Sequence, residues 1–257
     1  MATPCNFVWY ELMTSDDQAA RDFYAEVVGW RTQDAGQPHM QYTLLVAGEA
    51  PVAGLMTLPK EACDAGAKPG WIGYVGVDDV DACVQRIQKA GGTMHMPPTD
   101  IPGIGRFAMV ADPQGASFNL FKGGAQTMDQ PAADPAKPGL IGWHELYAVD
   151  GEKAFGFYAE MFGWTKAEAI DMGEMGRYQL FAAGSVPIGG MMAKPANLPM
   201  PFWNYYFQVD ATGAAMERLK SAGGQVINGP MQVPGGSWIV QGVDPQGAMF
   251  SLVSSKA

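Results

Sequence analysis

The 257-residue chain is 47% hydrophobic and has 26 acidic against 16 basic side chains, which gives a formal net charge of −10. This acidic balance argues against a continuous basic surface of the kind that binds nucleic acid or anionic membranes. We therefore expect a globular protein whose partner is a small-molecule ligand.

The beginning of the chain predicts a strand, a helix and two more strands. The sequence over Phe7–Leu12 is typical of a strand. Ser15, followed three positions later by Gln18, resembles a capping box and predicts that a helix begins there. Gly29 follows the last apolar residue at helical spacing and is placed to end this helix. Further strands are predicted over residues 41–47 and 52–57.

A second cycle of strand and helix follows and closes with a hairpin. Trp71–Val77 is rich in aromatic and branched side chains and predicts a strand, and the helix predicted over 79–90 ends at Gly91. Residues 112–115 read Asp-Pro-Gln-Gly, in which proline presets a turn dihedral and glycine can adopt a positive φ. We therefore expect antiparallel strands over 106–111 and 116–121.

The second half of the chain repeats the first. Trp-Tyr-Glu-Leu at 9–12 returns as Trp-His-Glu-Leu 134 positions later, and the hairpin sequence Asp-Pro-Gln-Gly-Ala returns after 132 positions. A repeat of this length is too long for a solenoid, so we predict two homologous modules. The predicted organisation is a first module at 1–122, a linker rich in Pro, Gly and Ala at 123–139, and a second module at 140–257.

Three motifs occur twice and in the same order: a helix ending in Phe-Tyr and then Gly-Trp, an Ala-Gly-Gly after the second helix, and the Asp-Pro-Gln-Gly-Ala hairpin. Together they resemble the vicinal oxygen chelate superfamily, which includes glyoxalase I, extradiol dioxygenases and bleomycin-resistance proteins. The Trp-x-Glu-Leu opening resembles a two-module glyoxalase-like branch whose members are sometimes classified as hydroxylases. The resemblance implies an α+β fold of tandem βαβββ modules, whose mixed, curved sheets form cups.

In metal-using members of that superfamily, His, Gln or Glu ligands come from the first strand, the strand before the second helix, and the last strand. The resemblance places these positions at Trp9 and Trp143, at Ile72 and Asn204, and at Asn119 and Ser251. None is a firm ligand, because the common divalent metals prefer imidazole, thiolate or carboxylate groups. We therefore expect no metal cofactor, with an unconventional divalent metal site that uses His144 and Glu145 as the alternative.

Glu11 and Glu145 are the predicted catalytic residues. Each lies two positions beyond a tryptophan, and because side chains alternate along a strand, each should face the cup with that tryptophan. Burial disfavours the charged form of a carboxylate, so each glutamate could act as a general base or hold a cationic or hydroxyl-bearing ligand. The alternative is that each accepts hydrogen bonds from backbone or Tyr groups and closes a structural network.

The predicted ligand-binding residues are Trp9, Trp143, Tyr74, Asn204, Tyr206, Arg106 and Trp238. Arg106, which has no basic counterpart in the second module, could anchor an anion, or it could be an exposed arginine paired with an acid. Trp30 and Trp164 are predicted to be packing residues. His144 is predicted to pack on the helix side of its strand, with a catalytic role as the alternative.

The remaining features favour a soluble, cytoplasmic protein. Its three cysteines have no repeat equivalents and no metal-type spacing, which favours neither disulfides nor a thiolate zinc site. The chain has no basic segment followed by an apolar one at its start, and no apolar stretch of the roughly 20 residues that a membrane helix needs. The sequence contains no Gly-rich phosphate loop, so we expect no nucleotide cofactor. We expect a monomer or a homodimer.

Three functional hypotheses follow. The first is a protein that binds a small organic molecule in an aromatic cup without the usual metal, with Glu11 or Glu145 orienting the ligand. The second is a lyase, isomerase or oxygenase that uses a glutamate as base or an unconventional metal site. The third is a binding protein that sequesters a drug or metabolite, as resistance proteins of the superfamily do.

Overall fold

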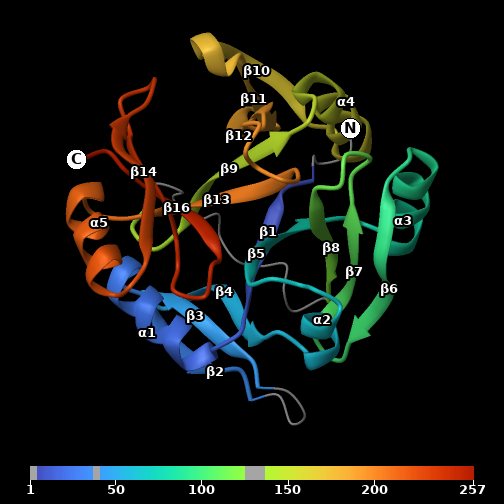
Figure 1. The fold of residues 1–257 in the computed structure, drawn as a ribbon. Helices are drawn as coiled ribbons and strands as arrows, with labels where there is room; N and C mark the ends of the chain where they lie inside the picture. Colours follow the sequence, from blue (N-terminus) through green and yellow to red (C-terminus); the bar gives the residue numbers. More distant parts are fainter. Residues whose placement is uncertain (1–4, 37–40, 125–136) are drawn as a thin grey trace. The chain divides into compact units, whose positions relative to one another are not determined.

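The computed structural model describes residues 5–36, 41–124 and 137–257, so most of the predicted linker at 123–139 lies outside the described residues. The described part forms an α+β fold with two eight-stranded mixed sheets (Figure 1). The strand orders are β2-β3-β4-β1-β5-β8-β7-β6 and β10-β11-β12-β9-β13-β16-β15-β14, so the second sheet repeats the topology of the first. The predicted fold class is confirmed.

The elements of the first repeat are β1 (Phe7–Thr14), α1 (Asp17–Val28), β2 (Arg31–Asp34), β3 (Thr43–Ala47), β4 (Ala50–Thr57), α2 (Lys60–Asp64), β5 (Gly70–Gly76), α3 (Val80–Lys89), β6 (Thr93–Ile101), β7 (Gly105–Ala111) and β8 (Ser117–Gly123). Strands β1 and β4 pair in parallel, as do β5 and β8, whereas the β7–β8 hairpin is antiparallel as predicted.

The elements of the second repeat are β9 (Ile141–Ala148), α4 (Gly151–Phe162), β10 (Thr165–Asp171), the 3₁₀ helix η1 (Gly173–Met175), β11 (Arg177–Ala183), β12 (Val186–Ala193), β13 (Phe202–Gln208), α5 (Thr212–Ser221), β14 (Gln225–Gln232), β15 (Trp238–Val243) and β16 (Met249–Ser254). Again β9 pairs in parallel with β12, and β13 with β16.

The start of α1 differs from the prediction, whereas its end does not. Asp16, not Ser15, is the N-cap, because its carboxylate accepts the backbone N–H of Ala19 at 3.0 Å. Gln18 does not close a capping box; its amide donates to Asp22 at 3.0 Å. The helix ends at Gly29, whose φ of 86° is the left-handed conformation that glycine adopts without steric cost.

The aspartate of each Asp-Pro-Gln-Gly turn is buried. From the sequence, only its place in the turn was predicted. Asp112 accepts the backbone N–H groups of Gln114 at 2.8 Å and Ala116 at 3.0 Å, and Asp244 closes the second turn in the same way. Burial raises the pKa of both carboxyl groups, and these backbone donors oppose that rise.

Each of these aspartates also accepts a hydrogen bond from a tyrosine of the other repeat. Contacts group the chain into two compact units: Met1–Val8, Gly73–Ala132 and His144–Trp203 in the first, and Trp9–Ile72, Ala133–Trp143 and Asn204–Ala257 in the second. In the first unit, Tyr158 donates to Asp112 at 3.1 Å and accepts from the indole of Trp203 at 3.0 Å. In the second, Tyr24 donates to Asp244 at 3.1 Å. Each unit therefore joins a helix of one repeat to a hairpin of the other.

Helix packing within the second unit also joins the two repeats. Helices α1 and α5, which belong to different repeats, lie side by side (Figure 1). The guanidinium of Arg218 on α5 donates to the backbone oxygens of Glu26 and Val27, both at 2.9 Å. Arg218 thereby occupies carbonyl groups in the last turn of α1, where a helix leaves its own acceptors unpaired.

Trp30 and Trp164 are packing residues, as predicted. Both are only 2% exposed, and each indole N–H donates to a backbone oxygen at 2.7 Å, of Gly139 and of Cys5 respectively. Each packs among aromatic rings of its own unit, for example Trp30 against Phe207, with 4.9 Å between ring centroids. Their hydrogen-bonding capacity is used by the core.

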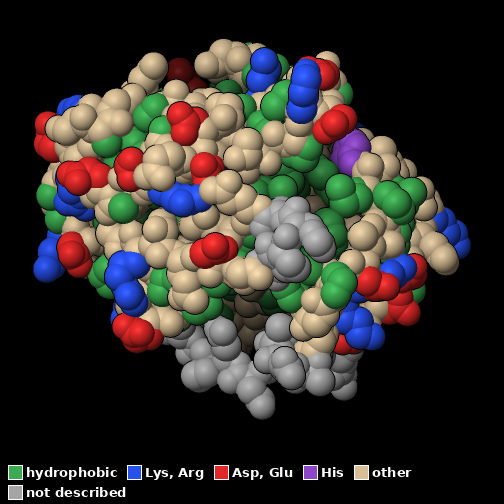
Figure 2. All heavy atoms as spheres, turned by 90° about the horizontal axis from the view of Figure 1, so that it is seen from below, with side chains coloured by type: hydrophobic (Ala, Val, Ile, Leu, Met, Phe, Trp, Pro, Cys, Tyr) green, Lys and Arg blue, Asp and Glu red, His purple; other side chains and the backbone are tan. Residues whose placement is uncertain are grey.

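The surface agrees with the composition. On the face drawn in Figure 2, acidic and basic side chains are interspersed, and the basic ones do not form a continuous patch. None of the helices within residues 5–36, 41–124 and 137–257 combines the length and apolar character needed to cross a membrane.

Candidate functional site

The two predicted catalytic glutamates are buried. Glu11 on β1 is 5% exposed and Glu145 on β9 is 6% exposed. In the second unit, Trp9 and Glu11 share one face of β1, because both side chains bond to the same tyrosine, Tyr42. Leu12, the next residue along the strand, is fully buried. The shared tyrosine partner agrees with the period-two spacing of Trp9 and Glu11 along a strand, whereas a cup lined by this face stays a prediction.

Trp9, Tyr42 and Glu11 form a chain of hydrogen bonds. The indole N–H of Trp9 donates to the Tyr42 hydroxyl oxygen at 3.0 Å, and that hydroxyl donates to Glu11 Oε2 at 3.0 Å. Burial and the charge of Glu11 raise the pKa of Tyr42 well above its usual value, so its phenol remains protonated as a donor. The carboxylate is thereby fixed in one orientation on an aromatic face.

A glycine makes room for this tyrosine. Glu11 pairs with Gly54 across β1 and β4, and a Cβ at Gly54 would overlap the hydroxyl and ring of Tyr42. The second module repeats the geometry in the first unit: Glu145 pairs with Gly190, and a Cβ at Gly190 would overlap the ring of Tyr178. The tyrosine precedes its glycine by twelve residues in both modules. This arrangement was not predicted from the sequence, although the equal spacing of tyrosine and glycine in the two modules was a signal for it.

Asn204 and Ser251 bond to one another. The Asn204 amide nitrogen donates to Ser251 Oγ at 2.7 Å, and the two side chains are 1% and 0% exposed. The amide oxygen of Asn204 is buried without a hydrogen-bond partner. In the first unit, the amide oxygen of Asn119 is also buried and unpartnered.

Asn204 belongs to one face of the second unit, which we call the β13–β16 face: Asn204, Tyr206, Ile239, Gln241, Ser251 and Val253. Register places Tyr206, Ser251 and Gln241 in one row across β13, β16 and β15. Gln241 donates to the Tyr206 hydroxyl at 3.1 Å. Tyr206, Ile239 and Val253 form an apolar cluster against which the partly buried Trp143 packs. Three of the predicted ligand-binding residues, Trp143, Asn204 and Tyr206, thus lie in the same unit around this face.

Tyr74 lies on the corresponding face of the first unit. It is 5% exposed and packs against Phe107 and Phe121, with ring centroids 6.3 and 6.2 Å apart. Asn119 is its register partner on β8. This face therefore also combines aromatic rings with an unpartnered amide oxygen.

Arg106 and Trp238 are separated from these faces. Arg106 pairs with Asp81 of α3 at 2.7 Å and with Asp100 at 2.8 Å, which is the surface ion pair considered as the alternative to anion binding. Because neighbouring strand residues point to opposite faces, Arg106 lies opposite Phe107, and Trp238 lies opposite Ile239. Neither side chain is therefore grouped with Tyr74 or Tyr206.

His144 is a packed histidine. It is 4% exposed, stacks on Phe7 with ring centroids 4.2 Å apart, and its Nδ1 lies 2.6 Å from the backbone oxygen of Ile188. A carbonyl accepts, so Nδ1 carries the proton of a neutral ring. Burial lowers the pKa of His144 from 6.5 to about 4.

The residues at the superfamily's metal positions do not fit a divalent cation. Indole, alkyl, amide and hydroxyl groups stand there, and Asn204 and Ser251 are bonded to each other. Among the described residues, no three His, Cys, Asp or Glu side chains are grouped so that they could hold an ion.

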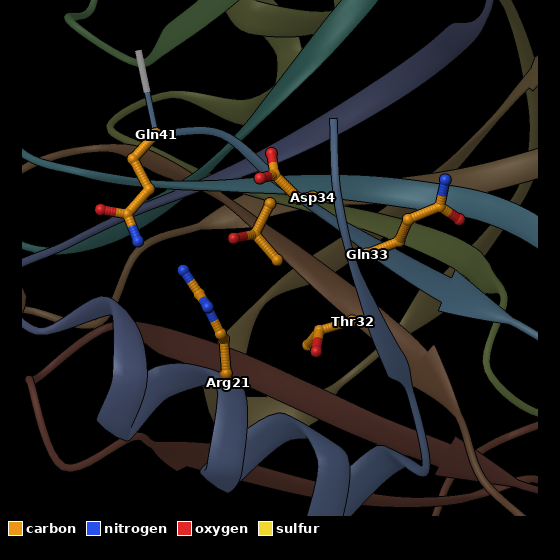
Figure 3. Close-up of a pocket in the computed structure, with 6 residues that line it drawn as sticks. Arg21, Thr32, Gln33, Asp34 and Gln41 are labelled. Carbon is orange, nitrogen blue, oxygen red and sulfur yellow. The ribbon is translucent and has the colours of Figure 1, made fainter. Parts of the chain in front are cut away.

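A small polar hollow lies elsewhere in the second unit, at α1, β2 and the start of β3 (Figure 3). It is lined by Arg21, Thr32, Gln33, Asp34, Gln41 and Thr43. Arg21 is ion-paired with Asp17 on its own helix. None of the predicted site residues lines the hollow, and its walls lack aromatic rings.

Comparison with solved structures agrees with the fold. The Mn(II)-bound glyoxalase from Novosphingobium aromaticivorans superposes with a TM-score of 0.65 at 19% identity, covering 99% of this chain and 83% of that one. The 2,2',3-trihydroxybiphenyl 1,2-dioxygenase from Sphingomonas wittichii strain RW1 superposes with a TM-score of 0.67 at 12% identity, covering 99% and 91%. At such identities the likeness concerns the fold alone.

Relatives of higher sequence identity match along nearly the whole chain. The Mycobacterium tuberculosis protein named "Putative glyoxylase CFP32" is 32% identical over 251 residues, covering 95% of this chain and 93% of the relative. The "Anthracycline biosynthesis protein DnrV" of Streptomyces peucetius is 30% identical over 258 residues, covering 95% and 91%. The family model for the Glyoxalase/Bleomycin resistance protein/Dioxygenase superfamily matches twice, at residues 6–120 and 140–252. The chain therefore belongs to this superfamily.

Proposed function

We propose that this protein binds a small organic molecule with a flat, apolar body, and that Glu11 or Glu145 orients the ligand without a tightly bound divalent metal. The observation that supports this most is the Trp9–Tyr42–Glu11 chain, which fixes a buried carboxylate beside aromatic side chains. A carboxylate held in this way suits a hydroxyl-bearing or cationic group of a ligand. The tyrosine–glycine arrangement beside Glu145 supports the same role in the second module.

The first test is to identify what the purified protein contains. Native mass spectrometry of protein prepared without chelator should reveal a bound organic molecule, and metal analysis should give far less than one divalent ion per chain. Dialysis against EDTA should leave the thermal midpoint unchanged, because the proposed protein holds no tightly bound metal whose removal would destabilise the folded state. Retention of one ion per chain by the wild type, but not by Glu11→Gln or Glu145→Gln, would contradict the proposal.

The second candidate is an enzyme that uses Glu11 or Glu145 as a general base, and the relatives named for glyoxylase activity and anthracycline biosynthesis support it. With a substrate found by screening ketones and aldehydes, Glu11→Gln or Glu145→Gln should lower kcat by about 100-fold or more. The amide keeps the size of the side chain and its capacity to accept from tyrosine, but not its basicity. Unchanged turnover in both variants would remove the glutamates from the mechanism, and tight binding without product would favour sequestration.

A further inference from the structure

The polar hollow at α1, β2 and the start of β3 is a site that the proposed function does not use (Figure 3). Its volume is about 110 Å³. A water molecule in the liquid occupies roughly 30 Å³, so the hollow admits about four waters or one small polar molecule of similar size. The hollow is separate from the glutamate site, because Tyr42, which lies between Gln41 and Thr43 in the sequence, bonds to Glu11 and does not line it.

Two hydrogen-bond donors in the wall of the hollow lack a partner. Arg21 points from α1 toward Gln41 (Figure 3), and its Nη2 pairs with Asp17 on the same helix. The Nε of Arg21 is buried and has no hydrogen-bond partner among the described residues. Thr43 is only 4% exposed, and its hydroxyl likewise bonds to none of the residues that the structure describes. Buried polar groups are rarely left in this state unless a ligand or water satisfies them.

Hydrogen-bond acceptors stand beside these donors. Asp34 pairs with Thr43 across β2 and β3, which places both side chains on the same face of the sheet. Asp34 Oδ1 accepts the backbone N–H of Gly36 at 2.9 Å, but no basic side chain within the described ranges pairs with this carboxylate. The amide nitrogen of Gln41 donates to Asp17 at 3.3 Å, which leaves the amide oxygen of Gln41 as a further acceptor. Asp34 and Gln41 are exposed, so a ligand reaches the hollow directly from solvent.

We propose that this hollow binds the zwitterion of a small α-amino acid, of the size of glycine. The ligand carboxylate accepts from Arg21 Nε and from the Thr43 hydroxyl. Its ammonium group donates to Asp34 and to the amide oxygen of Gln41. Because Asp17 balances the charge of Arg21, the hollow keeps the negative charge of Asp34 and disfavours an anionic ligand. A simple ammonium ion, in turn, would leave both donors unpaired. The site is independent of the organic ligand proposed above.

Three matched probes test the chemical class by NMR titration of isotope-labelled protein, in which the Arg21 Nε–H and the Gly36 amide report on the hollow directly. Glycine has both charged groups, acetate only the carboxylate, and methylammonium only the ammonium group. Each end forms charge-assisted hydrogen bonds, so the wild type should bind glycine at least about tenfold more tightly than either single-group probe. Equal affinity for all three, or signals that glycine does not shift, would overturn the inference and identify the hollow as a water site.

Thr43→Val tests the donor side while nearly keeping the shape of the side chain. It should weaken glycine binding about tenfold and leave the thermal midpoint unchanged or higher, because the hydroxyl has no partner to lose among the described residues. Thr93→Val, the same change at an exposed position of β6, should leave binding unaltered. A Thr43→Val variant that binds glycine like the wild type would refute the donor role of Thr43, whatever its midpoint.

Asp34→Asn tests the acceptor side by a change of sign. The amide keeps an oxygen for the Gly36 N–H but removes the negative charge. Glycine should therefore bind less tightly than to the wild type, and acetate more tightly, since its carboxylate no longer meets a like charge. An unchanged ratio of the two affinities would contradict the placing of the ammonium group at Asp34 and with it the zwitterion site.

Discussion

Replacement of Gly54 by alanine should lower the free energy of unfolding by about 2–4 kcal/mol, through one specific side chain. The added methyl group would overlap the hydroxyl and ring of Tyr42, so the ring must leave its place. Trp9 and Glu11 would then lose the hydroxyl that joins them, and Glu11, only 5% exposed, would lose a donor to its carboxylate. Urea denaturation of the variant measures the loss.

A double-mutant cycle shows whether the tyrosine is the cause. With Tyr42 already replaced by alanine, the clash is absent and Gly54→Ala should cost little, so the two changes should be strongly non-additive. Gly190→Ala with Tyr178→Ala forms the matched cycle in the second module. Additive effects would mean that the glycine is needed by the strand backbone and not by the tyrosine.

The sequence predicted those elements whose signals are local. The end of a helix was predicted at Gly29, because glycine readily adopts the left-handed conformation found at helix ends. The hairpin was predicted from the turn chemistry of Asp-Pro-Gln-Gly alone. The cap of α1 was assigned one residue too early, because Ser15 and Asp16 are both good caps and only the fold decides between them. Strands β2, β6, β10 and β14 were missed because most of their residues are exposed and carry little apolar signal.

The two glutamates of the candidate site were predicted from the sequence, but the side chains that bond to the site residues were not. Period-two alternation places Glu11 with Trp9, but nothing local links it to Tyr42, 31 residues away, or Asn204 to Ser251, 47 residues away. Likewise, the turn aspartate Asp112 bonds to Tyr158 of the other repeat. Such pairs depend on which strands become neighbours, and that is a property of the assembled core.

His144 should make the protein less stable in acid by about 3 kcal/mol between pH 6.5 and pH 4. Burial lowers its pKa from 6.5 to about 4, so within this interval the unfolded chain binds a proton that the folded protein excludes. Proton uptake by the unfolded state favours unfolding as pH falls. The contribution of His144 is therefore fully present above about pH 6.5 and is lost on the way to pH 4, as urea denaturation at a series of pH values would measure.

His144→Phe isolates this effect, since phenylalanine can keep the stacking on Phe7 but has no proton to bind. Losing the hydrogen bond to the oxygen of Ile188 lowers stability equally at every pH above 6.5, whereas the loss in acid should disappear. The raised pKa values of Asp112 and Asp244 act in the opposite direction, because acid then favours the folded state; the difference between wild type and variant removes their contribution. His95→Gln, at an exposed position, serves as the control and should follow the wild type. Parallel pH curves for wild type and His144→Phe would mean that the imidazole accepts its proton inside the fold, in which case His144 regains its candidacy as an acid–base group.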